Sequence, residues 1–280
     1  MVRQKDELIA PIVKWAGGKR QIIEQIIKYV PEDFSTYFEP FLGGGAVLFE
    51  LQPRKAVVSD ISKELINIYL VIKNSIEELI EDLRKHRNDK GYFYEVRRRD
   101  RDREHYNRLP AVQRASRMLF LNKTCFNGLF RVNKSGEFNV PFGNYKKPNI
   151  VNEKTLRAVS NYFNESTITI ACWDFERALE GAEKGDFVYL DPPYDPLSGS
   201  SNFTNYCEKG FDRSEQLRLK KACDSLHKKG VSFLLSNSAT DFIKDLYRHY
   251  RIEVIQAKRA INSKASGRGA VDEVLVMNYK

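Results

Sequence analysis

Short apolar runs alternate with amphipathic segments along most of the chain. From about Ser62 to Arg84 apolar residues recur at helical spacing, which predicts one long helix. Asp212 to Lys229 predicts another helix, with Gly230 just past its end. The apolar runs predict strands at Tyr37–Glu39, Ala56–Ser59, Thr167–Cys172, Phe187–Leu190 and Val231–Leu235, the last three of them buried. Because helices separate these strands, we expect right-handed crossovers and a largely parallel sheet.

The end of the chain and its middle depart from this alternation. The last two β-type runs, Ile252–Ile255 and Glu273–Tyr279, have no helix between them, so we expect them to pair antiparallel. The predicted fold class is therefore α/β, a Rossmann-like mixed sheet with helices on both faces. Residues 84–158 interrupt the pattern and predict a second, mostly helical unit that ends in a β-hairpin. This unit is inserted between segments 1–83 and 159–280.

Positive charge collects in the same insert. The net charge of the chain is +9, and residues 84–158 contain 19 of its 46 lysines and arginines but only 7 of its 37 aspartates and glutamates. The insert thus has an excess of 12 positive charges, while the remainder, with 27 basic and 30 acidic residues, is slightly negative. A dedicated basic surface indicates a polyanionic partner. The alternative is a solvated helix face whose charges are partly compensated, as in the run from Arg97 to Glu104.

Composition excludes several classes of protein. With 280 residues, 42% of them hydrophobic and 30% charged, the chain is ordinary for a globular protein and unlike collagen-like, disordered or disulfide-rich sequences. No apolar run approaches the roughly 18 residues of a membrane span, and residues 1–10 lack the features of a secretory signal, so we expect a cytoplasmic protein without a membrane partner. Four cysteines lack metal-ligand spacing and predict buried thiols and no metal site: Cys125, Cys172, Cys207 and Cys223.

A glycine-rich loop follows the first predicted strand and opens a helix. Gly43, Gly44 and Gly45 permit a tight turn and a close approach of a ligand to the backbone. Three residues after Gly45 stands Leu48, so the third glycine of a dinucleotide fingerprint is missing. A nucleoside cofactor without a pyrophosphate fits better, and S-adenosylmethionine is the common one; Asp60, at the end of the next strand, would accept hydrogen bonds from its ribose. A nicotinamide-dependent dehydrogenase stays open as the alternative.

A proline-rich corner follows the strand at Phe187–Leu190. In Asp191-Pro192-Pro193-Tyr194 the two prolines lock φ and remove two backbone donors, which predicts a stiff bend at the carboxyl end of the strand. Open α/β sheets bind ligands at that end. The Asp191 carboxylate and the Pro192 carbonyl would accept both N–H bonds of an exocyclic amine and localise its lone pair for attack on a sulfonium methyl, while Tyr194 stacks on the base. An ordinary turn after a strand is the alternative.

These motifs, in this order, resemble the alpha class of Dam-type adenine-N6 DNA methyltransferases, a family that modifies GATC. The resemblance covers nearly the whole chain and rests on Lys14–Lys19, Phe38–Gly45, Ser59–Ile61, Phe126–Arg131, Gly136–Gly143 and Asp191–Tyr194, with Ser200–Tyr206 and Ser236-Asn237. It implies that segments 1–83 and 159–280 form an S-adenosylmethionine-dependent catalytic domain of the methyltransferase fold. It also implies that residues 84–158 form a DNA target-recognition domain, whose hairpin reads the major groove, and that the target adenine flips out of the duplex.

The resemblance implies roles at individual positions. Catalytic positions fall on Asp191, Pro192 and Tyr194. Cofactor-binding positions fall on Trp15, Lys19, Glu39, Phe41, Gly43, Asp60, Asp174 and Asp191. DNA contacts fall on Lys14, Lys123, Phe126, Asn127, Arg131, Pro141 and Tyr145. Among these, Phe126 and Asn127 would enter the duplex, and Lys14, Arg131 and Pro141 would contact bases.

The chain departs from some relatives within the recognition segment. Phe126 stands where a tyrosine occurs, and Lys123 and Asn144 stand where arginines occur, so a side chain among residues 145–147 would have to anchor the hairpin to phosphates. We expect a monomer that acts on double-stranded DNA, with a restriction endonuclease as a candidate partner. Methylation of adenine in RNA and a DNA-binding module without catalysis are the remaining alternatives.

Overall fold

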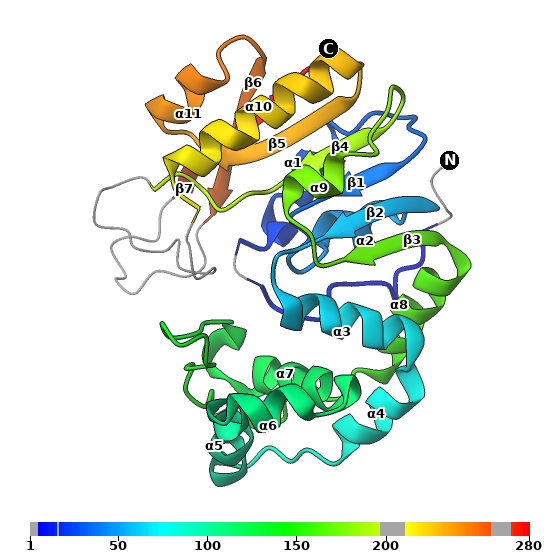
Figure 1. Ribbon diagram of the computed structural model, residues 1–280, viewed down its shortest axis with the longest axis vertical. Coiled ribbons are helices and arrows are strands. Elements are labelled where there is room, and N and C mark those ends of the chain that lie inside the picture. The colour runs from blue at the N-terminus through cyan, green and yellow to red at the C-terminus, as the bar shows by residue number, and fades with distance from the viewer. Residues whose placement is uncertain (1–4, 16, 197–210, 259–269) are drawn as a thin grey trace.

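A mixed sheet forms the centre of the computed structural model, which describes residues 5–15, 17–196, 211–258 and 270–280 (Figure 1). The strand order is β3-β2-β1-β4-β5-β7-β6. The first five strands run parallel, and β7 pairs antiparallel with both β5 and β6, which confirms the predicted mixed sheet. The strands are β1 (Tyr37–Glu39), β2 (Lys55–Ser59), β3 (Thr167–Ala171), β4 (Phe187–Leu190), β5 (Ser232–Ser238), β6 (Arg251–Lys258) and β7 (Ala270–Met277).

Helices cover both faces of the sheet because successive strand residues point to opposite sides. Tyr37 and Phe187 belong to one hydrophobic core, whereas their chain neighbours Phe38 and Val188 belong to the other. The first core is closed by α1 (Ile23–Ile27), α2 (Ala46–Leu51), α3 (Lys63–Asn74), α4 (Ile76–Arg84) and α8 (Glu153–Glu165). The second is closed by α9 (Phe175–Leu179), α10 (Arg213–Lys229) and α11 (Asp241–Leu246), which Figure 1 shows on the side facing the viewer.

The strand order creates a switch point in the middle of the sheet. From β1 the chain passes to β2 and β3 on one side, and it later returns to β4 and β5 on the other side of β1. The carboxyl ends of β1 and β4 are therefore adjacent, at the place where connections leave in opposite directions. Open α/β sheets bind their ligands in such a position.

The insert is mostly helical, as predicted. It contains α5 (Lys90–Arg98), α6 (Arg103–Arg108) and α7 (Ala111–Thr124), with short 3-10 turns at Arg99–Arg101 and Phe126–Gly128. Figure 1 shows these helices at the end of the molecule opposite α10 and α11. The hairpin that follows is short, with one isolated antiparallel bridge between Val132 and Phe138 and a second that joins Cys125 to Phe142.

The predicted limits of the insert are not sharp features of the structure. The limit between residues 158 and 159 falls within α8, and the apolar side chains of α7 belong to the same core cluster as one face of the sheet. The division into a catalytic and a recognition domain therefore stays a prediction.

The single long helix predicted from Ser62 to Arg84 is wrong, because α3 and α4 meet at Ser75. Its φ of −146° and ψ of 48° leave the helical region. Its N–H still donates to Val71 O, and its carbonyl accepts from Leu79 N, so one residue ends α3 and begins α4. Serine competes for backbone hydrogen bonds in this way, and apolar periodicity alone did not reveal the break.

The prediction of a buried strand at Thr167–Cys172 with a buried thiol is also wrong. β3 is an edge strand that ends at Ala171, and Thr167 and Thr169 are exposed while Ile168 and Ile170 are buried. Cys172 lies beyond the strand and is exposed; Cys125 and Cys223 are buried, and Cys207 lies outside the described residues. In the described parts of the chain, no helix is long and apolar enough to cross a membrane.

Candidate functional site

The Asp191 corner lies at the switch point of the sheet. All four residues of β4 are buried, so the chain reaches Asp191 from a rigid strand. The Oδ1 atom of Asp191 lies 2.7 Å from Lys19 Nζ and accepts a hydrogen bond of 3.0 Å from Ser236 Oγ. Burial raises the pKa of Asp191, and Lys19 and Ser236 oppose that rise. The side chain keeps 19% of its surface exposed, so a ligand can still reach it.

Lys19 and Tyr194 are fixed together beside this carboxylate. Lys19, which is 5% exposed, donates from Nζ to Gly17 O at 2.8 Å and lies 4.6 Å from the centre of the Tyr194 ring. The Tyr194 hydroxyl donates to Glu273 on β7 at 2.7 Å. Burial raises the pKa of Tyr194 well above its ordinary value, so the phenol stays protonated and keeps this bond. The protein itself thus holds the Tyr194 ring in one orientation.

The bend around Tyr194 is held by the carboxyl end of β5 and by α10. Asp195 N donates to Asn237 Oδ1 at 3.1 Å, and Ser238 Oγ donates to Asp195 O at 2.7 Å. On the other side, Gln216 of α10 donates from Nε2 to Pro193 O at 2.9 Å. These bonds satisfy the backbone groups that the proline corner leaves without sheet partners.

The glycine loop is bonded to the carboxylate that follows β2. Asp60 accepts from Gly43 N at 3.0 Å and from Ser62 N at 2.9 Å, and the Tyr69 hydroxyl donates to Gly43 O at 2.9 Å. Burial raises the pKa of Asp60. At the start of α2, Gly45 adopts a φ of +68°, and a Cβ there would lie 2.8 Å from Phe49 Cε2. Only glycine fits this turn without strain.

Glu39 lies beneath the loop at the end of β1. Its Oε2 atom accepts from the Tyr37 hydroxyl at 2.8 Å and from Leu48 N at 3.1 Å. Burial raises the pKa of Glu39 to about 8, so the carboxyl carries a proton at neutral pH. The structure therefore brings the carboxyl groups of Glu39, Asp60 and Asp191 to the ends of three adjacent strands.

The other predicted cofactor residues lie on two sides of this carboxyl group cluster. Trp15 stacks on Phe130 of the insert, with ring centres 4.4 Å apart, and a Cβ on Gly43 would lie 3.1 Å from Trp15 Cδ1. Phe41 packs with the second hydrophobic core, on the other face of the sheet, and stacks on Phe175 with ring centres 5.5 Å apart. Asp174 caps α9 through Glu176 N and forms an ion pair with Arg218.

Two predicted DNA-binding lysines belong to a cluster of positive charge. Lys14 exchanges two backbone hydrogen bonds of 2.9 Å with the Asn122 amide, and its side chain packs so closely on Gly128 that a Cβ there would lie 2.4 Å from Lys14 Cδ. Burial, together with the neighbouring cations Arg20 and Lys14, lowers the pKa of Lys123 to about 8. Such a cluster is suited to an anionic ligand.

The remaining DNA-binding candidates lie on the hairpin and the turn before it. Phe126 is 52% exposed, which is unusual for a large apolar side chain, and Asn127 has a φ of +56°. Phe126 N donates to Pro141 O at 2.8 Å, which holds this turn against the second arm of the hairpin. Arg131 donates from Nε to Asn139 Oδ1 at 2.7 Å, and the Tyr145 ring lies against Gly143.

Sequence reasoning missed Glu273 and Asp195 and named Ser236 only as part of a motif, without a role. Ser236 contacts Asp191, Glu273 contacts Tyr194, and Asp195 anchors the bend. The register of β4 on β5 pairs Leu190 with Leu235, which puts Ser236 level with Asp191. A polar residue at the end of the neighbouring strand was the available signal for Ser236. The motif segment Ser200–Tyr206 lies outside the described residues.

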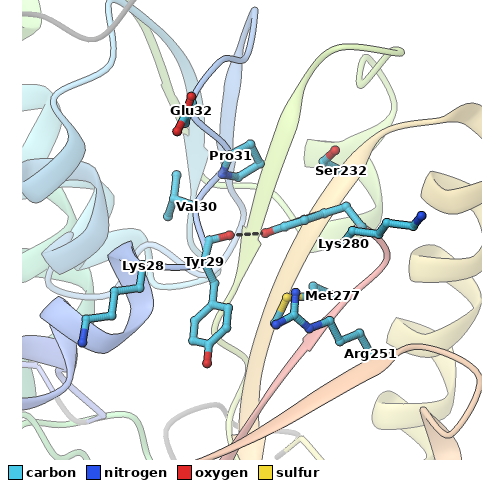
Figure 2. A pocket seen from close by; sticks show the side chains of 10 residues that line it. Lys28, Tyr29, Val30, Pro31, Glu32, Ser232, Arg251, Met277 and Lys280 are labelled. Atoms are coloured by element: carbon cyan, nitrogen blue, oxygen red, sulfur yellow. Dashed lines mark hydrogen bonds between the residues drawn. The ribbon is translucent and has the colours of Figure 1, made fainter.

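A separate cavity of about 420 Å³ lies at the opposite edge of the sheet (Figure 2). Figure 2 shows Lys28–Glu32 facing Arg251 and Met277 across it. Ser232 begins β5 and Met277 ends the antiparallel β7, so the cavity lies at the amino ends of the parallel strands. No predicted site residue lines it. Within the described ranges, no group of three or more His, Cys, Asp or Glu side chains is placed to hold a metal ion.

Comparison with known proteins gives consistent matches over almost the whole chain. Residues 15–261 match the family described as D12 class N6 adenine-specific DNA methyltransferase. The chain is 44% identical over 279 residues to Type II methyltransferase M1.LlaDCHI of Lactococcus lactis subsp. cremoris, covering 99% of this chain and 98% of that protein. It is 42% identical to Type II methyltransferase M.MjaIII of Methanocaldococcus jannaschii, with 97% and 99% covered, and 33% identical to a DNA adenine methylase of Vibrio cholerae, with 95% and 94% covered.

Proposed function

Because the chain belongs to the D12 class of N6 adenine-specific DNA methyltransferases, we propose that it methylates N6 of adenine in GATC within double-stranded DNA, with S-adenosylmethionine as methyl donor. Family membership excludes the nicotinamide-dependent dehydrogenase considered from the sequence. The observation that carries the proposal is the Asp191 corner at the switch point, rigidly fixed and still partly exposed. The finer assignments below rest on this geometry and on the motifs.

The residues around the glycine loop fit S-adenosylmethionine. Its sulfonium and amino groups are cationic, and the carboxyl groups of Asp60 and Asp191 lie at the ends of β2 and β4. Asp60 is positioned to accept from ribose hydroxyls, and the Phe41–Phe175 stack offers an aromatic surface for an adenine ring. When bound, the cofactor supplies a methyl group activated by its positive sulfur.

The Asp191 carboxylate prepares the attacking amine. Lys19 and Ser236 both engage Oδ1, so Oδ2 is the oxygen offered to one amino N–H, and the Pro192 carbonyl accepts the other. Two acceptors draw the nitrogen toward tetrahedral geometry and localise its lone pair. Tyr194, already fixed by Lys19 and Glu273, stacks on the base. The proton can leave after methyl transfer, so Asp191 need not be a strong base.

The insert would recognise the target sequence in the DNA. A hairpin fits the major groove, where Arg131 would donate to O6 and N7 of a guanine. The exposed Phe126 and the left-handed Asn127 would fill the space that the target adenine leaves when it flips out. Lys123 and the neighbouring Arg20 would lie along the phosphate backbone. Lys14 would contact a base, as the resemblance implies. Pro141 and Tyr145 stay candidate contacts because they flank the second arm.

The biological setting belongs to the proposal as well. Two relatives are named Type II methyltransferases, which supports a restriction endonuclease as the functional partner. We expect a cytoplasmic monomer, since a single chain brings together the cofactor side and the DNA side.

Methyl transfer from tritium-labelled S-adenosylmethionine tests the proposal. We expect label in a GATC duplex, none in a duplex with a scrambled site, and protection of methylated plasmid from endonucleases blocked by adenine methylation at GATC. Asp191→Ala should lower the rate by at least about 10²-fold while the variant still binds DNA, whereas the exposed Asp245→Ala should not change it. Label only in RNA, or normal turnover by Asp191→Ala, would refute the proposal.

A further inference from the structure

A chain of buried and partly buried hydrogen bonds connects α3, beside the glycine loop, to the hairpin. We propose that Arg117 and Asp100 are positioning residues for target recognition: they set where the hairpin stands relative to the catalytic sheet. The inference rests on the proposed function in one respect, namely that Arg131 reads the target. Neither residue touches the cofactor side directly, so both act through their neighbours.

The hairpin cannot fix its own position. Its internal pairing is a single bridge, Val132 with Phe138, and a hairpin of that size is not stable by itself. The insert helices grip its second arm instead. Phe138 N donates to Asp100 Oδ2 at 2.8 Å, and Phe138 O accepts from Arg101 at 2.9 Å. Asp100 is only 4% exposed, so this contact is shielded from water.

Phe138, which is bonded to Asp100, lies next to Asn139, which is bonded to Arg131. Asn139 follows Phe138 directly, its N–H donates to Arg131 O at 3.1 Å, and its side chain accepts from Arg131 Nε at 2.7 Å. A shift of Phe138 therefore moves the guanidinium that would meet the guanine. Since base reading depends on hydrogen-bond geometry, a small displacement is enough to weaken it.

Arg117 fixes the carboxylate that grips the hairpin. It is 2% exposed, and its Nη2 lies 2.8 Å from Asp100 Oδ2. Its other donors reach Val96 O at 2.9 Å and Arg97 O at 2.8 Å, which ties α7 to the end of α5. Because a buried ion pair largely offsets its own desolvation, the contribution of this pair is the fixed geometry of a planar donor rather than net stability.

The same guanidinium continues the chain toward the cofactor side. Arg117 Nη1 donates to the Tyr106 hydroxyl at 3.3 Å, and that hydroxyl donates to Glu64 Oε2 at 2.9 Å. Glu64 lies in the first turn of α3, whose N-cap Ser62 is bonded to Asp60. The hairpin is thus connected by hydrogen bonds to the start of α3. The same helix start is bonded to Asp60, which also holds the glycine loop.

The test separates a loss of sequence-specific DNA binding from a general loss of folding of the insert. The variants are Asp100→Asn/Arg117→Leu, which removes both buried charges, and Tyr106→Phe, which removes only the hydroxyl between Arg117 and Glu64. The control is Glu104→Gln/Arg108→Gln, which removes both charges of an exposed ion pair in the same insert and leaves the net charge unchanged. For each protein we would measure affinity for a GATC duplex and a scrambled duplex, S-adenosylhomocysteine affinity, and kcat and KM for DNA, well below its melting temperature.

We expect the ratio of specific to non-specific DNA affinity to fall about tenfold in the double variant and about threefold in Tyr106→Phe, as for the loss of a base contact. KM for DNA should rise in parallel, while scrambled-duplex affinity, S-adenosylhomocysteine affinity and kcat at saturating DNA stay within about twofold of wild type. The control should match wild type throughout.

Two results would overturn the inference. If both affinities fall together, or if kcat falls at unchanged KM, the network only folds the insert. If the double variant does not fold, Tyr106→Phe decides alone, and an unchanged affinity ratio there refutes the role of the chain. A wild-type protein that methylates no DNA would instead refute the proposed function, which the wild-type reactions establish before any variant is compared.

Discussion

The buried carboxyl of Glu39 makes the stability of the protein depend on pH in a predictable direction. Its pKa is about 8 in the folded protein because burial disfavours the anion, against an ordinary value of 4.5. Between these values the folded state binds a proton that the unfolded state has lost. Stability therefore falls as pH rises from 4.5 to 8 and is constant above that, as far as this group is concerned.

The magnitude follows from the two pKa values. Each pH unit in this window lowers the free energy of unfolding by about 1.4 kcal/mol. The decrease is roughly 5 kcal/mol in total and about 2 kcal/mol between pH 6.5 and 8. Burial also raises the pKa values of Asp60 and Asp191, and these groups act in the same direction. Only the difference between wild type and Glu39→Gln isolates Glu39, since an amide can still accept from Tyr37 and Leu48.

Urea unfolding followed by circular dichroism at pH 6.5, 7.5 and 8.5 measures this difference. Relative to wild type, Glu39→Gln should gain about 2 kcal/mol in free energy of unfolding between pH 6.5 and 8.5. Glu78→Gln, on the exposed side of α4, is the matched control and should follow wild type. Parallel curves for wild type and Glu39→Gln would show that Glu39 is ionised in the folded protein and would refute the reasoning.

Three further predictions concern other parts of the molecule. Arg131→Ala should cost about 1–3 kcal/mol in binding to the target duplex and relax its sequence preference in a competition assay; equal weakening at all sequences would make Arg131 a phosphate contact. Burial lowers the pKa of His86 to about 4, so folded His86 stays neutral while unfolded His86 takes up a proton below pH 6.5. The free energy of unfolding of the wild type should therefore fall by about 2–3 kcal/mol from pH 6.5 to 4, and His86→Gln should lack this fall. An identical fall in the variant would contradict this. Gly45→Ala should destabilise by about 1–3 kcal/mol in thermal unfolding because it combines a positive φ with contact on Phe49, whereas Gly181→Ala, with nothing within 4 Å, should not; equal melting temperatures for the two variants would contradict the strain argument.

Local patterns were enough to locate the Asp191 corner. The run Phe187–Leu190 is short and wholly apolar, and the prolines after it end any regular structure, so the position of Asp191 at a strand end follows from the sequence. The alternation of strands and helices likewise predicted the largely parallel sheet with an antiparallel pair at the end, and the structure confirms both. The strand order, which puts this strand end beside that of Tyr37–Glu39, was not predicted, because β1 and β4 are far apart in the chain.

Contacts that depend on strand register or on tertiary burial could not be predicted in this way. Glu273 reaches Tyr194 because β7 returns antiparallel beside β5, a pairing set by distant parts of the chain. Asp100 belongs to the charged run from Arg97 to Glu104, which suggests a solvated surface, yet it is buried against Arg117 of α7. Charge spacing along a helix does not distinguish these two situations, because only the neighbouring helices and the hairpin exclude the water.

The central place of β1 in the sheet has a consequence for synthesis on the ribosome. β1 gains its partner β2 within some 20 residues, but its other neighbour, β4, emerges about 150 residues later. At typical rates of translation this interval is on the order of 10 s, during which one edge of the nascent strand has no native partner. An unpaired edge can capture other extended chains. Chaperone demand and inclusion-body formation should therefore be greatest before residue 190 has left the exit tunnel, while the helices of the insert can already form from local contacts.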